Sequence, residues 1–439
     1  MVITRSRTTW LKLSVLTSAI ALSGCQSTGL FFAEKKQETN HEKTSLELIP
    51  VPEETIVTAE ATTKKEPEPV QLTPQEQDDL WQRIRQQLVF DVPNVQRVQS
   101  QRNWYASHPE YLDRVAKRAE PYLHLIVEEL ERREMPIDLA LLPIVESAFD
   151  PFAYSHGSAS GVWQFIPGTA RQYGLDINWW YDGRRDVFAA THAALDYLEA
   201  LYRYFDGNWM HALAAYNSGE GRVGNAIRRN KRAGKPTDFW NLDLPRETRA
   251  YVPKLLALAD ILANSEKYGI TWYPIENQPM LEVVEAPAQI DLALAADMAD
   301  LSLEELHQFN SGYNRWATAP DGPHRFLLPA ENAEQFSLAL QKTEPKDWLS
   351  WTRHKVKSGE SLLTISKKYN TSVDVIQQLN DISSHIIRAG EHLLVPVATL
   401  GLENYTLSQD QRRENRQDQK RDGKRIDYIV QSGDTLWDI

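Results

Sequence analysis

The amino-acid sequence predicts a mainly α-helical protein, and the spacing of its apolar residues is the first reason. Between Leu112 and Leu130, apolar side chains recur every three or four residues, which places them on one face of a helix as a buried stripe. No strand pattern stands out between residues 78 and 273. Gly219 and Gly269 are candidate helix C-caps. Further helices are expected over residues 187–205, 209–217 and 247–268.

Length and composition limit the classes of protein to consider. The 439 residues exceed one compact domain and favour roughly three units. With 48 basic and 60 acidic residues, the net charge of -12 does not favour binding to nucleic acid or to an anionic membrane through bulk charge. The only cysteine, Cys25, excludes an intramolecular disulfide and a cysteine-based metal cluster.

Residues 1–25 have the pattern of a secretory signal. Arg5 and Arg7 precede an apolar stretch that is too short to span a membrane well. The stretch ends in Leu-Ser-Gly-Cys, which resembles the bacterial lipobox. That resemblance implies that Cys25 is acylated and anchors the protein without a transmembrane helix. Because Gln26 rather than Asp follows, the periplasmic face of the outer membrane is expected; the alternative is an ordinary signal peptide with a chance cysteine.

Residues 26–76 are expected to form a disordered tether. This segment is rich in Glu, Lys, Thr and Pro. Such a composition cannot bury enough apolar surface to offset the entropy of ordering. The tether would let a membrane-anchored protein reach away from the bilayer.

Glu146 is the first candidate catalytic residue. The apolar segment from Leu139 to Val145 ends on this carboxylate, and small, aromatic and proline residues follow that cannot continue a helix. A carboxylate at a helix C-terminus faces the negative end of the helix dipole, and apolar neighbours remove its water. Both effects favour the protonated form and predict a general acid near neutral pH. The alternative is a surface glutamate that closes an amphipathic helix.

Three motifs resemble the soluble-lytic-transglycosylase family, whose catalytic domain has a lysozyme-like fold. The first runs from Glu146-Ser147 through Gly161-Val162-Trp163-Gln164 to Tyr173-Gly174; the other two are residues 215–219 (Ala-Tyr-Asn-Ser-Gly) and 247–252 (Glu-Thr-Arg-Ala-Tyr-Val). Their agreement in order makes the resemblance specific. One departure is Ser-Ala-Ser before Gly161, where Gly-Ala-x-Gly is usual. The resemblance implies a lysozyme-like catalytic domain over residues 77–273.

The resemblance also implies a reaction in which peptidoglycan is cleaved without water. Glu146 is expected to protonate the oxygen that links N-acetylmuramic acid to N-acetylglucosamine. The resulting carboxylate then deprotonates the C6 hydroxyl of the same muramic sugar, which attacks C1 and closes a 1,6-anhydro ring. One carboxyl poised near neutral pH can perform both steps.

Further residues acquire roles by the same resemblance. Tyr251 is expected to hydrogen-bond the catalytic glutamate, although without the motif it and Tyr216 would be read as helix-packing aromatics. The amide of Gln164 can donate to and accept from an acetamido group. The expected substrate-binding residues are Ser147, Gln164, Tyr216, Asn217 and Tyr251.

Neither a second catalytic carboxylate nor a metal is expected. Asp150 lies four residues beyond Glu146 and suggests a two-carboxylate hydrolase, but Pro151 favours a loop residue that bonds the backbone. His156, His192 and His211 lack the spacing of a zinc motif. No cofactor is expected.

The C-terminal part resembles lysin motif (LysM) modules, which have a βααβ fold and bind N-acetylglucosamine-containing glycans. Residues 352–397 match the whole pattern, and residues 427–439 match the start of a second copy that is cut short. A weaker internal echo at 274–345 is interpreted as a degenerate LysM-like unit, which either binds glycan or serves as a structural spacer. The polar, mixed-charge residues 398–426 are expected to be a linker.

These observations favour a monomeric, lipid-anchored enzyme that binds and cleaves peptidoglycan glycan strands in cell-wall turnover. Two alternatives remain open at this point. A hydrolytic muramidase would use the same acid together with a positioned water and a second carboxylate. A non-catalytic wall-binding protein would only grip glycan, although Glu146 in its motif speaks against that class.

Overall fold

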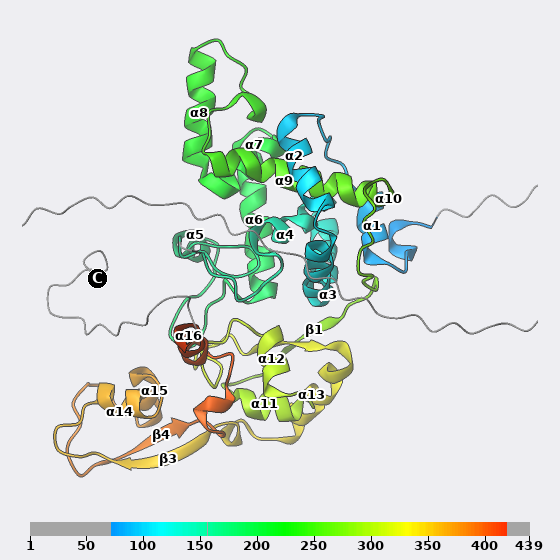
Figure 1. Ribbon diagram of the computed structural model, residues 1–439. Coiled ribbons are helices and arrows are strands. Elements are labelled where there is room, and N and C mark those ends of the chain that lie inside the picture. Colours follow the sequence, from blue (N-terminus) through cyan, green and yellow to red (C-terminus); the bar gives the residue numbers. More distant parts are fainter. Residues whose placement is uncertain (1–71, 156, 419–439) are drawn as a thin grey trace, which may run out of the picture. The chain divides into compact units, whose positions relative to one another are not determined.

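The computed structural model describes residues 72–155 and 157–418. The predicted signal with Cys25, nearly all of the tether, His156 and the truncated second LysM lie outside the described residues. Within the described part of the chain, no helix is long and apolar enough to cross a membrane. The helical region (Figure 1) comprises α1 (Leu80–Gln86), α2 (Gln96–Ala106), α3 (Pro109–Arg132), α4 (Leu142–Ser147), α5 (Pro167–Gln172), α6 (Val187–Tyr204), α7 (Trp209–Ser218), α8 (Glu220–Arg232), α9 (Arg246–Ala263) and α10 (Ser265–Tyr268).

The predicted apolar stripe forms the buried face of α3. Every member of the stripe is at most 1% exposed, and all belong to the main hydrophobic core together with residues of α6, α7 and α9. Burial of such a face is the main source of helix stability in a folded protein. The stripe therefore makes α3 a central element of the helical region. Its members are Leu112, Val115, Ala119, Leu123, Ile126, Val127 and Leu130.

The helix predicted over 247–268 is interrupted near its end. It forms α9 and the short α10, and Asn264 between them has a non-helical backbone with φ -125° and ψ 40°. The side-chain amide of Asn264 donates to the backbone oxygen of Asp260 at 3.0 Å. Such a side-chain bond to the backbone competes with helix continuation. The predicted caps are confirmed, because Gly219 (φ 84°) follows α7 and Gly269 (φ 64°) follows α10.

Two small units with the same order of elements follow the helical region. The first contains β1 (Leu281–Glu285), α11 (Leu292–Met298), α12 (Leu303–Phe309) and β2 (Arg325–Pro329), and α13 (Ala330–Lys342) is appended. The second contains β3 (Ser350–Lys355), α14 (Leu362–Lys368), α15 (Val373–Leu379) and β4 (His392–Val397). In each unit the two strands pair antiparallel. The predicted strand-helix-helix-strand order is therefore present in both.

The first small unit is joined to the helical region by buried polar contacts. The backbone nitrogen of Asp182 donates to Gly312 O at 2.8 Å, and Arg185 Nε donates to Ser311 O at 3.0 Å. The guanidinium of Arg325, on β2, pairs with Asp186 at 2.7 Å. All of these charged side chains are at most 15% exposed. Buried charges are stable only when they are paired and hydrogen-bonded, so the contacts fix how the two parts meet.

The expected linker at 398–426 is a wrong prediction over residues 398–418. Residues 398–418 contain the short 3-10 helix η5 (Leu402–Asn404) and the helix α16 (Gln409–Asp418). Tyr405 is 1% exposed, and its hydroxyl donates to Asp291 Oδ1 at 2.9 Å. On α16, Asp410 pairs with Arg315 at 2.6 Å, and the guanidinium of Arg412 lies 4.7 Å from the ring centre of Phe152. The mixed charges that suggested a solvated run find partners on the folded core.

We expect Tyr405→Phe to lower the free energy of unfolding by about 1–2 kcal/mol, because the buried Asp291 carboxylate loses one hydrogen-bond donor. Urea denaturation followed by tryptophan fluorescence measures the change. Tyr204→Phe is the matched control, since Tyr204 is 56% exposed. Equal curves for both variants and the parent protein would contradict a structural role for this segment.

Candidate active site

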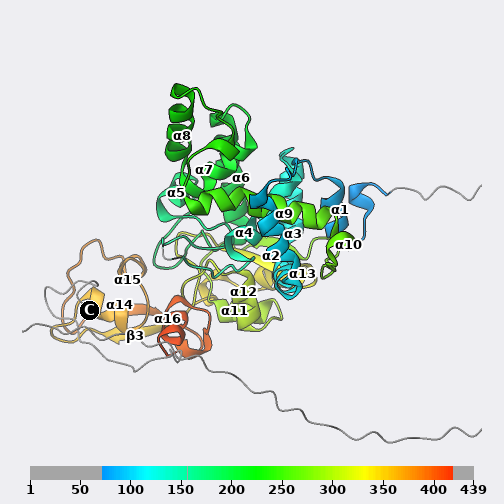
Figure 2. The ribbon, with the colours of Figure 1, turned by 45° about the horizontal axis from the view of Figure 1, so that its top comes forward.

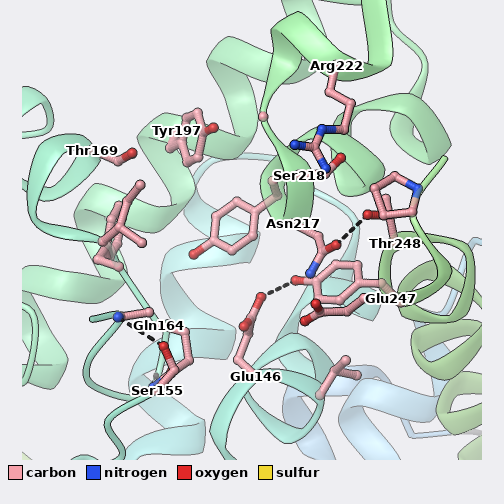
Figure 3. A pocket seen from close by; sticks show the side chains of 18 of the residues that line it. Glu146, Ser155, Gln164, Thr169, Tyr197, Asn217, Ser218, Arg222, Glu247 and Thr248 are labelled. Carbon is pink, nitrogen blue, oxygen red and sulfur yellow. Dashed lines mark hydrogen bonds between the residues drawn. The ribbon is translucent and has the colours of Figure 1, made fainter. Parts of the chain in front are cut away.

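A cavity of about 620 Å³ collects most of the predicted site residues (Figure 3). Its walls come from the end of α4, the loop that leads into α5, the junction of α7 with α8, and the first half of α9. Residues that are up to 105 positions apart in the sequence meet here. The predicted residues that line it are Glu146, Gln164, Tyr216, Asn217 and Tyr251.

The backbone beyond Glu146 turns sharply and ends α4. Ala148 and Phe149 both have left-handed conformations, with φ of 53° and 56°. Such conformations cost roughly 1–3 kcal/mol for residues other than glycine and persist only where packing holds them. Phe149 supplies that packing, because its side chain is fully buried in the core. The turn therefore fixes Glu146 at the last turn of a helix, as the sequence predicted.

The Gly-Val-Trp-Gln motif is held in place by its glycine, its tryptophan and the loop before it. Gly161 has φ +83°, and a Cβ atom there would lie 1.8 Å from the backbone oxygen of Arg184, so only glycine fits. Trp163 is fully buried and donates from Nε1 to Thr191 Oγ1 at 2.9 Å. The guanidinium of Arg184 donates to Ser158 O at 2.7 Å, which ties the preceding loop to the same segment.

Gln164 is oriented by this loop. Its side-chain nitrogen donates to Gly161 O at 2.8 Å. The amide oxygen accepts no hydrogen bond from the described residues, and Gln164 lines the cavity. An amide fixed on one side and free on the other suits recognition of a donor on a ligand.

Glu146 is half-buried at the cavity wall, and its carboxyl group lies against α9. The pKa of Glu146 is raised to about 7; loss of water on burial is the largest cause, and the nearby carboxylate of Glu247 contributes in the same direction. A hydrogen bond from the hydroxyl of Tyr251 to Oε1 and the positive charge of Lys254 oppose this rise. The predicted direction of the pKa shift thus holds in the structure, with burial as its largest cause. A carboxyl with this pKa exchanges its proton readily near neutral pH.

Tyr251, which is buried, and Tyr216, which is half-buried, lie beside the acid. Tyr251 is 4% exposed, and burial beside Glu146 raises the pKa of its phenol well above the usual range. It therefore stays protonated and remains a donor to the carboxylate. The hydroxyl of Tyr216 donates to Trp163 O at 2.9 Å, which links α7 to the Gly-Val-Trp-Gln loop.

Asn217 is oriented from the other wall of the cavity. The hydroxyl of Thr248, near the start of α9, donates to Asn217 Oδ1 at 2.8 Å (Figure 3). Because the side-chain oxygen is held by Thr248, the side-chain nitrogen points the other way. Asn217 therefore presents N–H donors to the cavity, whereas Gln164 presents an acceptor.

Ser147 and Asp150 both lie outside the cavity lining, which contradicts the predicted substrate-binding role of Ser147 and agrees with the predicted loop role of Asp150. Ser147 does not line the cavity; its hydroxyl donates to Val162 O at 3.0 Å, so it braces the turn instead of facing a ligand. Asp150 accepts a hydrogen bond from the backbone nitrogen of Phe152 at 2.9 Å, as expected of a loop residue. Asp150 does not line the cavity either, so it cannot act there as a second carboxylate.

Further lining residues received no role from the sequence; they include three on α9 and two on α8, Glu220 and Arg222. Glu247, Thr248 and Lys254 share a helix face with Tyr251, at spacings of three and four residues. That spacing was the signal available to find them. Arg222, on the first turn of α8, gives no such signal, because its place depends on how α8 follows Gly219.

The site chemistry is that of one ionisable acid between polar orienting groups. Among the described residues, no three His, Cys, Asp or Glu side chains come together in a way that could hold a metal ion. The carboxyl of Glu146 can donate a proton, and the anion that remains is stabilised by Tyr251. The amides of Gln164 and Asn217 can bind acetamido or hydroxyl groups of a ligand.

Three protein families match this chain. Residues 125–239 match the Transglycosylase SLT domain, which includes Glu146, Gln164, Tyr216 and Asn217. Residues 280–344 match the LysM-like domain of lytic transglycosylase MltD. Residues 354–396 and 428–439 match the LysM domain. The matches follow the same order as the helical region and the two small units.

Curated relatives extend these matches over nearly the whole chain. Membrane-bound lytic murein transglycosylase D of Escherichia coli (strain K12) is 37% identical over 436 residues, which are 97% of this chain and 90% of that protein. A putative soluble lytic murein transglycosylase of Haemophilus influenzae is 33% identical over 129 residues, or 28% of this chain and 21% of that protein. Among solved structures, an inactive mutant of lytic transglycosylase Slt from Pseudomonas aeruginosa matches with 23% identity and a TM-score of 0.28, over 43% of this chain and 32% of that one.

We expect the pKa of Glu146 to move in opposite directions in two single variants. Tyr251→Phe removes a hydrogen bond to the carboxylate and raises the pKa, whereas Glu247→Gln removes a nearby negative charge and lowers it. A ¹³C NMR titration of the glutamate side-chain carboxyls measures both shifts, and Glu146→Gln assigns the signal. A shift in the same direction in both variants would contradict the described surroundings.

We expect Glu146→Gln to stabilise the fold at pH 8. The folded-state pKa of Glu146, about 7, lies above the unfolded value, so its contribution to stability is lost as the pH rises from about 4.5 to 7. The Gln variant cannot ionise and therefore avoids this loss of unfolding free energy, which is about 3 kcal/mol for the parent protein at pH 8. Denaturation curves at pH 5 and pH 8 test this, with Glu334→Gln on α13 as an exposed control. A variant that is less stable than the parent at pH 8 would refute the buried-acid assignment.

Proposed function

The chain belongs to the membrane-bound lytic murein transglycosylase D family, and from this premise we propose that Glu146 is the single catalytic acid and base of its reaction. The protein is a peptidoglycan lytic transglycosylase. The observation that carries the residue assignment is the buried carboxyl of Glu146, whose pKa of about 7 lets it donate and then accept a proton.

The reaction consists of two proton transfers by one carboxyl. Protonated Glu146 donates to the glycosidic oxygen between N-acetylmuramic acid and N-acetylglucosamine, and the C1–O bond breaks as that oxygen becomes a hydroxyl. The neighbouring acetamido oxygen assists departure at C1. The carboxylate then takes the proton of the C6 hydroxyl of the muramic sugar while that oxygen bonds C1. Glu146 is protonated again, the product carries a 1,6-anhydro ring, and no water is consumed.

Tyr251 supports the half of the cycle in which Glu146 is ionised. Its hydroxyl donates to Glu146 Oε1, and its own raised pKa keeps it a donor throughout. A charge-assisted hydrogen bond stabilises the anion more than the neutral acid. Tyr251 therefore limits how far burial raises the pKa, and the carboxyl remains able to lose its proton at each turnover.

Two amides with complementary presentation form the substrate-binding part of the site. Gln164 offers an oxygen and Asn217 offers N–H groups to the same cavity. An N-acetylated sugar carries one amide N–H and one carbonyl oxygen, so the pair matches that chemistry. Tyr216 shapes the wall next to the acid. The glycan strand also binds the LysM units, whose weak contacts add to those of the site through tethering.

The proposed setting is the periplasmic face of the outer membrane. The relative that aligns over 97% of the chain is membrane-bound by name, which supports membrane association. Acylation of Cys25 in the lipobox-like sequence would supply the anchor, and Gln26 after it favours outer-membrane sorting. We propose that the enzyme acts there as a monomer in cell-wall turnover.

We expect digestion of purified peptidoglycan sacculi by the protein without residues 1–25 to release 1,6-anhydro-muropeptides, detected by mass spectrometry. Glu146→Gln should release at least about a thousandfold less, because the proton donor and acceptor are both lost. Binding of the variant to sacculi should persist, which separates turnover from binding. Products with reducing ends would instead identify a hydrolytic muramidase, and no products from either protein would identify a binding module.

A further inference from the structure

The helix α8 and the turn after it carry a concentrated positive charge on an acidic chain. Between residues 220 and 235 the only acidic residue is Glu220, which leaves five positive charges in excess, whereas the whole chain has a net charge of -12. All of the basic side chains are exposed. They are Arg222, Arg228, Arg229, Lys231, Arg232 and Lys235.

These charges are not needed to hold α8 in place. The helix packs through Val223, Gly224 and Ala226 on its buried face. Within residues 72–418 without 156, Arg229 is the only one of the six basic residues with a carboxylate in ion-pair range, and its partner Asp243 is 3.8 Å away. Cations in the last turn gain from the helix dipole, but like charges three and four residues apart repel. An anionic ligand would relieve that repulsion.

The charged helix begins at the wall of the active-site cavity. Arg222 lines the cavity (Figure 3), as do Lys254 and the acidic residues Glu220 and Glu247. Arg232 lies ten residues further along the helix, which is about 15 Å along its axis. Figures 1 and 2 both show α8 leading outward from the end of α7. The positive charge therefore runs from the catalytic site to a distance beyond the reach of a single sugar ring.

The substrate supplies an anion at that distance. In peptidoglycan the sugar backbone is uncharged where its lactyl groups are amide-linked to peptides, and free carboxylates are carried by the stem peptides. These peptides extend away from the glycan strand. A strand seated in the cavity beside Glu146 would direct a stem peptide along one wall, and α8 is the wall with complementary charge.

We propose that α8 binds the carboxylates of the stem peptides on the strand held in the active site, so that the enzyme prefers peptide-bearing glycan. The proposal rests on the proposed function of the cavity. Arg222 would contact the carboxylate nearest the sugar, and Arg228, Lys231 and Arg232 would contact those further out. Anionic lipid is a second possible source of negative charge, but the continuity of α8 with the cavity favours the substrate.

The test compares one substrate with and without its negative charge. Glycan strands with native stem peptides are digested beside identical strands whose carboxylates have been converted to methylamides. The full chain carries Cys25→Ser so that no acyl chain contributes to binding. At low salt we expect kcat/KM to be at least fivefold higher on the native strands than on the methylamide strands, and we expect the difference to lie in KM. At high salt the two values of kcat/KM should become equal, because screening removes the attraction.

The variant Arg228→Gln, Lys231→Gln, Arg232→Gln should bring that ratio close to one. Glutamine has a helix propensity near that of Arg and Lys, so α8 should persist. The matched control is Arg114→Gln, Lys117→Gln, Arg118→Gln on α3, which removes three exposed charges of the same sign away from the cavity and should retain the ratio.

Three outcomes would overturn the proposal. In the first, the α8 variant keeps the preference for native strands. In the second, the control loses that preference as much as the α8 variant does, which would mean that the effect depends only on net charge. Alternatively, vesicles of phosphatidylglycerol could bind the parent protein but not the α8 variant while the substrate ratio stays unchanged, which would assign α8 to lipid. Failure of the proposed function is distinguishable, because it would leave both kinds of strand without anhydro products.

Discussion

The burial of one carboxyl group, that of Glu146, is the constraint to which the rest of the site is fitted. A buried carboxyl is kept near its neutral form by the loss of water, and the Tyr251 hydroxyl prevents it from becoming permanently neutral. To hold it there, the chain accepts two consecutive left-handed residues after α4 and anchors them with the buried ring of Phe149. The packing of this turn thus keeps the proton of Glu146 exchangeable near neutral pH.

The C-terminal units repeat one topology but meet their surroundings in different ways. The unit that contains β1 and β2 is fixed to the helical region through the Arg325–Asp186 ion pair and buried hydrogen bonds, whereas the unit that contains β3 and β4 has its own small core around Ile365 and Ile376. The helix α16 returns to the first unit and to Phe152, close to the catalytic turn. The first small unit and the helical region therefore share side-chain contacts as well as a chain connection.

Much of the site could be predicted because its signals are local in the sequence. The apolar run that ends on Glu146 and the three ordered motifs placed five of the lining residues, and the periodicity of α3 placed a central part of the core. The remainder depended on distant partners. Ser147 stands beside the acid in sequence, but its hydroxyl turns to Val162 O. The polar segment after residue 398 resembled a linker, because nothing local reveals that Tyr405 meets Asp291 across 114 positions.

Arg184 and Arg185 are neighbours in the sequence that hold two different parts of the molecule. Arg184 reaches the loop before Gln164 through Ser158 O, and its own backbone oxygen lies against Gly161, while Arg185 binds Ser311 O in the first small unit. A single peptide bond thus connects the contact with the loop before Gln164 to the contact with the first small unit. A shift of the first small unit against the helical region would therefore be transmitted through this peptide bond to the loop that carries Gln164.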